Sequence, residues 1–151
     1  MATTFGTQSA KVLGATKSTP NPGFVHGTPR VYTEQVTLAS QAAADIIVLG
    51  MIPKGSVFLY GILETDTSLG STTLAISSAT LNSAATTATV VTAGKYRAAA
   101  TFTATDTPTF FGVTAATGVA STSDEIVVGV IAAATAPASG NLKVTLVYSH
   151  N

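Results

Sequence analysis

The chain has 151 residues, of which 46% are hydrophobic and only 9% are charged, compared with about 25% charged residues in typical soluble domains. Its seven basic and seven acidic side chains cancel, which argues against a nucleic-acid partner, and the absence of cysteine excludes disulfides and Cys-ligated metals. No apolar run approaches the ~20 residues of a membrane-spanning helix, and residues 1–7 lack the basic and apolar regions of a secretory signal. We therefore expect one domain, made in a cytosol, with neither nucleic acid nor membrane as its partner.

Residues 1–29 differ from the rest of the chain, because glycine and proline are frequent and the apolar residues follow no regular period. Three cations precede the first acidic residue: Lys11, Lys17 and Arg30. Proline fixes φ and lacks a backbone donor, so this composition predicts an extended N-terminal arm that gains order on a neighbouring surface. A frayed terminus without a function is the alternative. The arm is favoured because five large apolar side chains would stay unburied if this segment were a solvated tail: Phe5, Val12, Leu13, Phe24 and Val25.

From residue 30 onward, short runs of β-branched and aromatic residues alternate with turn residues, which is typical of an all-β domain. Nine strands are predicted, at 31–38, 45–50, 56–63, 71–76, 86–92, 95–102, 108–113, 124–131 and 141–148. Turns are predicted at 53–55 and 93–94, and the only places for a helical turn are 42–44 and 132–136. Eight or nine strands with regular turn spacing predict a two-sheet β-sandwich, jelly-roll-like, over residues 30–151.

Alternation along the strands predicts which side chains face the core. In the last strand, Leu142, Val144, Leu146 and Tyr148 are expected inward, and Lys143 and Thr145 outward. A common face is predicted for Tyr96, Ala98, Ala100 and Phe102. The aromatic residues assigned to the core are Phe58 or Tyr60, Tyr96, Phe102, Phe110 and Tyr148. This assignment leaves no exposed aromatic row of the kind that binds carbohydrate.

Residues able to carry catalysis or to bind metals are sparse. His26 and His150 lie in the arm and next to the last residue, with no nucleophile or orienting partner indicated. The acidic side chains form two pairs at strand ends: Glu64 with Asp66, and Asp124 with Glu125. Carboxylates in such positions commonly accept hydrogen bonds from turn amides, and a surface calcium site at Asp66 is the best metal alternative. We expect no enzymatic activity, no cofactor and no metal.

The segment Asp45-Ile-Ile-Val-Leu-Gly-Met-Ile-Pro-Lys-Gly-Ser-Val carries a resemblance to a known family. With the Thr-rich strand before it, the apolar strand after it and a terminal strand ending near Tyr, it resembles the capsid decoration, or cement, proteins of tailed bacteriophages. In that family the segment reads D-x-I-x-L-G-x-[IL]-P-K-G. The matching pieces are 32–38, 45–55, 57–70 and 142–148, and the Ala/Thr-rich stretch between Asn82 and Gly94 departs from the pattern.

The resemblance implies a β-sandwich that assembles as a homotrimer on the outer surface of an icosahedral head. Such a protein bridges capsomers of the major capsid protein, and no catalytic residues are carried over. Arms that lie along the capsid surface are also common in the family, which agrees with the arm expected at residues 1–29. The candidate contacts with the capsid or a partner are Phe5, Lys11, Lys17, Phe24, Arg30 and Lys54.

Two other interpretations stay open. The same composition suits another virion structural subunit, such as a tail, fibre-base or head-completion protein. A secreted glycan-binding β-sandwich is the third possibility, but the missing signal, the absence of Trp and the scattered carboxylates argue against it.

Overall fold

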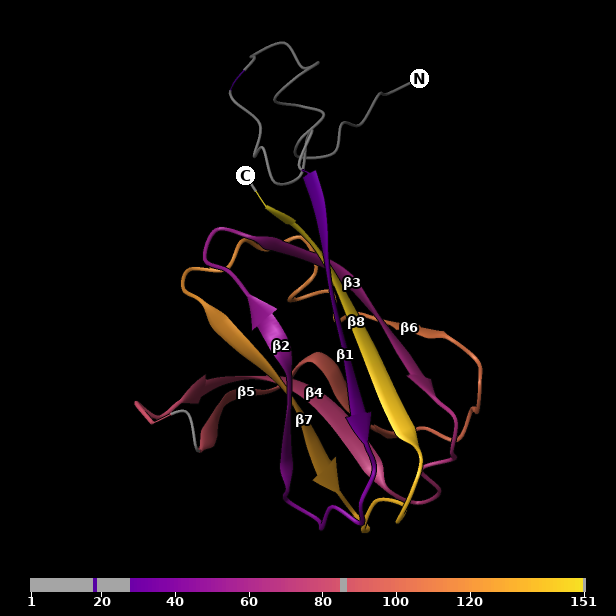
Figure 1. The fold of residues 1–151 in the computed structure, drawn as a ribbon. Coiled ribbons are helices and arrows are strands. Elements are labelled where there is room, and N and C mark those ends of the chain that lie inside the picture. The colour runs from indigo at the N-terminus through magenta and orange to yellow at the C-terminus, as the bar shows by residue number, and fades with distance from the viewer. Residues whose placement is uncertain (1–17, 19–27, 85–86, 151) are drawn as a thin grey trace, which may run out of the picture.

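The computed structural model describes residues 18, 28–84 and 87–150, which form two antiparallel four-stranded sheets packed face to face (Figure 1). The strands are β1 (Thr28–Thr37), β2 (Ile46–Ile52), β3 (Val57–Thr65), β4 (Thr73–Leu81), β5 (Ala88–Thr101), β6 (Thr109–Phe111), β7 (Glu125–Ala132) and β8 (Asn141–His150). Across these described ranges no helix occurs, so none is present that could cross a membrane. The predicted all-β, two-sheet sandwich is confirmed. The arm at 1–29 lies almost wholly outside the described residues and stays a prediction, although β1 already begins at Thr28.

The strand order is that of a jelly roll. One sheet has the order β1-β8-β3-β6, and the other has the order β2-β7-β4-β5. The first strand pairs with the last, β2 with β7, β3 with β6 and β4 with β5, always antiparallel. The chain therefore behaves as one long antiparallel ribbon of four strand pairs that is rolled into two sheets, which is the jelly-roll arrangement.

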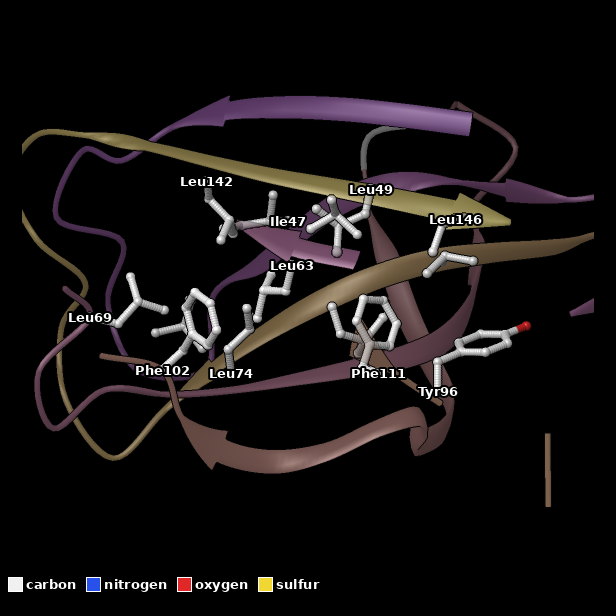
Figure 2. Packing of buried hydrophobic residues seen from close by; sticks show 14 of the residues in the cluster. Ile47, Leu49, Leu63, Leu69, Leu74, Tyr96, Phe102, Phe111, Leu142 and Leu146 are labelled. Atoms are coloured by element: carbon white, nitrogen blue, oxygen red, sulfur yellow. The ribbon is translucent and has the colours of Figure 1, made fainter. Parts of the chain in front are cut away.

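The core lies between the inner faces of the two sheets (Figure 2). Strand β8 shows how the sequence produces it, because Leu142, Val144 and Leu146 are fully buried while Lys143 and Thr145 are partly exposed on the other face. The opposite sheet contributes Leu49, Ile52, Leu74, Ile76 and Ile131, all without appreciable exposure. Burying each such side chain stabilises the fold by about 1.5–3 kcal/mol, so this core needs no disulfide or metal.

A close approach between β3 and β6 completes one end of the core. Gly61 is paired with Phe111, and the ring of Phe111 occupies the space that a Cβ on Gly61 would need. Phe111 is 8% exposed and stacks on Phe58 with ring centroids 6.3 Å apart. Phe58 in turn meets Tyr96 edge to face at 4.8 Å. Glycine at position 61 is therefore what lets a large ring enter this layer.

The prediction of separate strands at 86–92 and 95–102 is wrong, because β5 runs through both ranges as a single strand. Gly94 has a φ of 63°, and the register against β4 shifts on both sides of Ser78. The turn signal at 93–94 thus produces a bulge rather than a reversal of the chain. A second shift in register, between Leu74 and Ile76 of β4, breaks the predicted common face. Tyr96 and Phe102 are buried, whereas Ala98 and Ala100 are exposed.

Phe110 also departs from the prediction. It was expected in the core but is 70% exposed, whereas its neighbour Phe111 is buried. The register pairs Phe110 with Ile62 on the outer face of the sheet. Alternation admits only one of two adjacent aromatic residues to the core, and the pairing with β3 decides which one.

The two Ala-rich segments contain turns rather than helix. Ala44 and Ala133 adopt positive φ angles of 78° and 66°, which residues with a Cβ adopt singly and not in helices. Ala44 precedes β2, and Ala133 follows β7. The Ala44 N–H donates to the carbonyl of Ile131 near the end of β7, so the two turns lie at the same end of the sandwich. These turns therefore close the β2–β7 pair.

Candidate functional site: two apolar outer faces

A row of apolar side chains crosses the outer face of the β1-β8-β3-β6 sheet. The register places Val147 between Val31 on β1 and Tyr60 on β3. One step along the strands, Ile62 lies opposite Phe110 on β6. Tyr60 and Ile62 flank the buried Gly61, and Phe110 precedes the buried Phe111, so these side chains point away from the core. Val31 and Val147 share their face through the pairing, although Val147 is only 7% exposed. We call this group the aromatic face: Val31, Tyr60, Ile62, Phe110 and Val147.

The aromatic face is open to solvent at its prominent members. Val31 is 64% exposed and Tyr60 is 41% exposed, and Tyr60 meets the still more exposed Phe110 edge to face with centroids 5.5 Å apart. The outer face of an antiparallel sheet is ordinarily polar. A contiguous exposed apolar patch with an aromatic pair marks contact with another macromolecule. The expectation that no exposed aromatic row exists is therefore wrong, although the 61° between the two rings does not make a flat platform for a sugar.

Farther along the same sheet the outer surface becomes polar. Thr33 and Thr145 approach each other at 3.1 Å between their hydroxyl oxygens. Beyond them, Lys143 forms an ion pair with Glu64 at 2.5 Å, beside Gln35. The charges at this end of the face thus neutralise each other within one chain.

The second sheet carries its own apolar outer surface. Ile46, Val48 and Met51 alternate along β2 with buried residues and are exposed. Their partners on β7 are Val130, Val128 and Ile126. We call the accessible part of this surface the β2–β7 strip: Ile46, Val48, Met51, Ile126 and Val130.

The two apolar surfaces reach the same side of the sandwich, where the edge strands β1 and β2 lie next to each other (Figure 1). Tyr32 of β1 packs its ring on Gly50 of β2, and a Cβ at Gly50 would lie only 2.6 Å from Tyr32 Cδ1. Gly50 also has a φ of 149°, which favours glycine. The side of the molecule between the sheets is therefore closed by a specific aromatic contact.

Two of the predicted contact residues gather at one end of the sandwich. Arg30 lies near the start of β1, and Lys54 lies in the turn that leads into β3; both are exposed. The register places the first residues of β1 and β3 against the last residues of β8, so these elements share one end. The Lys54 N–H donates to Asp124 Oδ1 at 2.8 Å, which fixes the turn. The other predicted contacts lie outside the described residues: Phe5, Lys11, Lys17 and Phe24.

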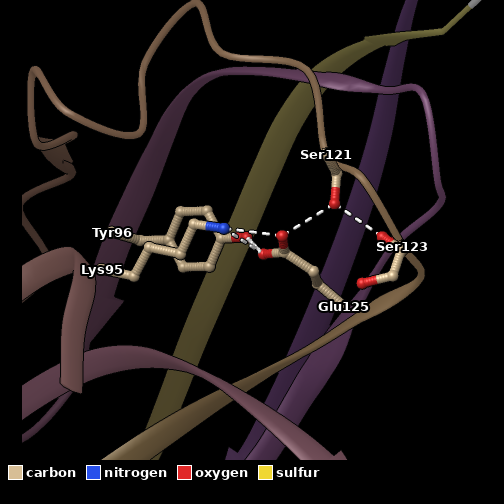
Figure 3. Close-up of polar contacts among 5 residues, drawn as sticks. All are labelled: Lys95, Tyr96, Ser121, Ser123 and Glu125. Atoms are coloured by element: carbon tan, nitrogen blue, oxygen red, sulfur yellow. Dashed lines mark hydrogen bonds and ion pairs between the residues drawn. The ribbon is translucent and has the colours of Figure 1, made fainter. Parts of the chain in front are cut away.

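The most concentrated polar cluster surrounds Glu125 at the start of β7 (Figure 3). Lys95 Nζ lies 2.6 Å from both carboxylate oxygens, and the Tyr96 hydroxyl donates at 2.5 Å. Ser121 Oγ lies 2.7 Å from the carboxylate and 2.6 Å from the carbonyl of Ser123. The bulge of β5 and the loop before β7 are thereby tied to one side chain.

The electrostatics of this cluster favour a structural role. Burial alone would raise the pKa of Glu125, but hydrogen bonds from Lys95, Tyr96 and Ser121 and the charge of Lys95 outweigh it, so the pKa lies below its usual range. Burial, followed by the bond to Glu125 and its charge, raises the pKa of Tyr96 far above normal. The adjoining cavity of about 40 Å³ offers room for little more than a water molecule. Glu125 therefore acts as an ionised crosslink between strands, with its acceptor positions occupied.

Asp66 and Asp124 behave as predicted for carboxylates at strand ends, because both accept hydrogen bonds from backbone amides. Asp66 accepts hydrogen bonds from the backbone N–H and the side-chain amide of Asn141, at 2.7 and 2.8 Å, and the backbone bond above all keeps the pKa of Asp66 below its usual range. In the part of the chain that the structure describes, no three His, Asp or Glu side chains are grouped to hold a metal. One contact had no counterpart in the sequence-based predictions. His150 Nδ1 lies 2.8 Å from Ser56 Oγ, but Ser56 is fully buried, so this hydroxyl cannot meet a substrate.

Comparisons with known proteins connect this fold to virus particles. No protein-family model matches the chain, and no curated protein matches it. A chain in the capsid of Ralstonia phage GP4 has 21% identity and a TM-score of 0.66, over 83% of this chain and 86% of that one. A chain of the cyanophage Pam1 capsid asymmetric unit has 19% identity and a TM-score of 0.65 over the whole of both chains. A chain in the acidic stable capsid structure of Helicobacter pylori bacteriophage KHP30 has 12% identity and a TM-score of 0.51, over 82% of this chain and 94% of that one. At these identities the likeness shows a shared fold.

Proposed function

We propose that this chain is a structural virion protein that decorates the outer surface of an icosahedral phage head. It stabilises the head by bridging capsomers of the major capsid protein. The observation that carries the proposal is a jelly roll, shared in fold with chains of three phage capsid structures, whose outer surface carries two exposed apolar areas, the aromatic face and the β2–β7 strip. Such faces are a liability for an isolated protein and an advantage for a subunit that is surrounded by other subunits.

Contact with the head is assigned to the end of the sandwich that carries Arg30 and Lys54. The turn at Lys54 is held by Asp124, so the exposed ammonium projects from a fixed backbone. The arm continues from this end and adds cations and aromatic anchors: Lys11, Lys17, Phe5 and Phe24. The contact end and the predicted arm together would give a subunit that spans a junction between capsomers.

The chain acts as a homotrimer in this proposal, with the major capsid protein and further copies of itself as its partners. Interface cores are depleted in charged residues, which suits a chain with 9% charged side chains. Repeated attachment on a lattice multiplies modest contacts into lasting ones. Catalysis plays no part, because the polar cluster at Glu125 serves to crosslink strands.

Heads of the phage that encodes this chain, prepared without it, provide the test. Added full-length protein should bind at a fixed, high copy number and raise the temperature at which packaged heads release DNA. Electron cryomicroscopy should place it on the outer surface where capsomers meet. Density on the tail, or no binding to heads, would overturn the proposal.

The contact end is tested by neutralising its cations in the full chain. Arg30→Gln and Lys54→Gln should weaken binding to heads while thermal unfolding stays unchanged, since both side chains are exposed. Asp106→Asn, a loss of one charge at an exposed position near the opposite end, is the matched control. Equal head binding by all three variants would remove Arg30 and Lys54 from the contact.

A further inference from the structure

We propose that the aromatic face binds a second copy of this chain, and that the second copy contributes its β2–β7 strip to the contact. The assignment concerns a surface that head contact alone does not use. It rests on the proposed function for the orientation of the molecule on the head, and it names the surfaces through which the proposed homotrimer would assemble.

The chemistry of the two surfaces is matched. Both are built from uncharged aliphatic or aromatic side chains, and neither contains a donor or acceptor other than the Tyr60 hydroxyl. Lys143 and Glu64, at one end of the aromatic face, form an ion pair within their own chain, and Arg30 precedes Val31 at the other end. With seven basic and seven acidic residues, two copies experience no net repulsion.

The available area fits a subunit contact. Four strands at spacings of about 4.8 Å and strand lengths of up to about 33 Å give each sheet an outer face of several hundred Å². Side-chain relief brings this to the order of the roughly 800 Å² that each partner buries in a stable complex. Phe110 supplies the dominant anchor, because it is a nearly free aromatic ring held in place by Tyr60.

Orientation separates this contact from the capsid. The cations Arg30 and Lys54 lie at an end of the strands, whereas the aromatic face runs parallel to the strands. If that end rests on the head, the aromatic face is directed along the head surface. It then faces a neighbouring decoration subunit and not the capsid protein beneath.

The contact joins two different surfaces, so each copy touches two neighbours. Such head-to-tail contacts either close into a ring or grow into a filament. Both surfaces reach the side formed by β1 and β2, where Tyr32 packs on Gly50. Because the two surfaces lie on opposite sheets, ring closure requires successive copies to turn about that side, and an open stack is the other outcome of the mass measurement.

The first experiment measures the mass of the full chain by analytical ultracentrifugation over a range of concentrations. The wild type should self-associate, and Phe110→Ser and Val31→Thr should each weaken association by roughly tenfold or more. Val91→Thr is the matched control, because Val91 is a 65% exposed valine on the edge strand β5, outside both surfaces. It should associate as the wild type does.

The second experiment tests the pairing of unlike surfaces by mixing two variants. Val48→Ser alone should also lose association, since it damages the strip. Mixed with Phe110→Ser, it should form dimers only, because the mixture retains one kind of intact contact. If the aromatic faces bound each other, the mixture would leave Phe110→Ser chains monomeric.

The outcomes separate this inference from the proposed function. A Val31→Thr chain that associates as well as Val91→Thr overturns the inference alone. A wild type that is monomeric at every concentration overturns the inference and the proposed homotrimer together, while head binding is decided by the separate assay on heads. A wild type that associates through this face but ignores heads overturns the proposed function alone. Should Phe110→Ser fold poorly, Val31→Thr decides the question, because a Val-to-Thr change keeps the β-branched shape.

Discussion

Phe110 and Phe111 are neighbours in sequence and lie on opposite faces of one sheet. Phe111 is enclosed between Gly61 and Phe58, whereas Phe110 touches Tyr60 and is otherwise open to solvent. The same type of side chain therefore stabilises the fold at position 111 and is available for contact with another molecule at position 110. In this protein the apolar content of a strand therefore reports two things: packing within the chain, and an exposed surface that the proposed contact between copies would use.

The sharpest test of that comparison is to truncate the two rings in turn. Phe111→Ala should lower the free energy of unfolding by about 3–5 kcal/mol, because it empties a packed site. Phe110→Ala should change it by less than ~0.5 kcal/mol when measured on dissociated chains. Urea unfolding at low protein concentration measures both. Similar losses for the two variants would mean that the faces are not distinct.

Gly61→Ala should destabilise the same buried contact from the β3 side, since Gly61 is paired with Phe111. The new methyl group would overlap the Phe111 ring, and because the neighbours are packed, a loss of about 1–3 kcal/mol is expected. Combining Gly61→Ala with Phe111→Leu should cost less than the sum of the two changes, because a smaller side chain relieves the overlap. Additive losses in a double-mutant cycle would show that the strain lies elsewhere. Gly70→Ala is a poor control because of its positive φ, whereas Ala98→Ser on exposed β5 should be close to neutral.

The alternation of apolar and polar residues along a strand explains which parts of the fold can be predicted from the sequence. Strands β2 and β8 alternate between buried and more accessible positions along most of their length, and their predicted ranges agree with the structure to within two residues. The bulge in β5 is different, because it depends on contacts with distant residues. Gly94 donates to Ser77 Oγ at 2.9 Å, and Lys95 reaches Glu125 from 30 positions away in sequence. No local pattern encodes those partners.

The interaction surfaces were predicted less well than the fold. Alternation shows that Tyr60 and Phe110 are candidates for burial but not which face of the sheet meets the other sheet. The β-bulge between Phe58 and Tyr60 places Phe58 inside and Tyr60 outside. Arg30 and Lys54 lie beside turn or strand-end residues and are exposed, and their contact with a partner is a prediction. The arm contacts stay predictions.

Acid should weaken the inner crosslink at Glu125 and leave the outer faces unchanged. Because the folded-state pKa of Glu125 is lowered, its contribution is complete above the unfolded value of about 4.3 and is lost as the pH falls through the folded value. Glu125→Gln should cost about 1–3 kcal/mol at neutral pH, and the difference from the wild type should shrink below about pH 4. Denaturant titrations across this range measure it, with Glu34→Gln on exposed β1 as a control for the loss of one charge. A difference that is constant with pH would contradict an ionised crosslink.

The smallest effect is expected at the polar end of the aromatic face. Lys143 and Glu64 form their ion pair at a partly solvent-exposed position, with side-chain exposures of 43% and 26%, so water and salt screen most of the attraction. A double-mutant cycle of Lys143→Met and Glu64→Gln should give a coupling of about 0.2–1 kcal/mol in stability, and less at high salt. The same variants sharpen the comparison between the two layers of contact. If the pair borders the surface where copies meet, Lys143→Met leaves Glu64 uncompensated next to that contact and should weaken self-association more than it weakens folding. Lys143→Met can also be made in the Phe110→Ser background, in which the chains are dissociated. If it then lowers stability as much as it does in the wild type, the ion pair serves the single chain alone.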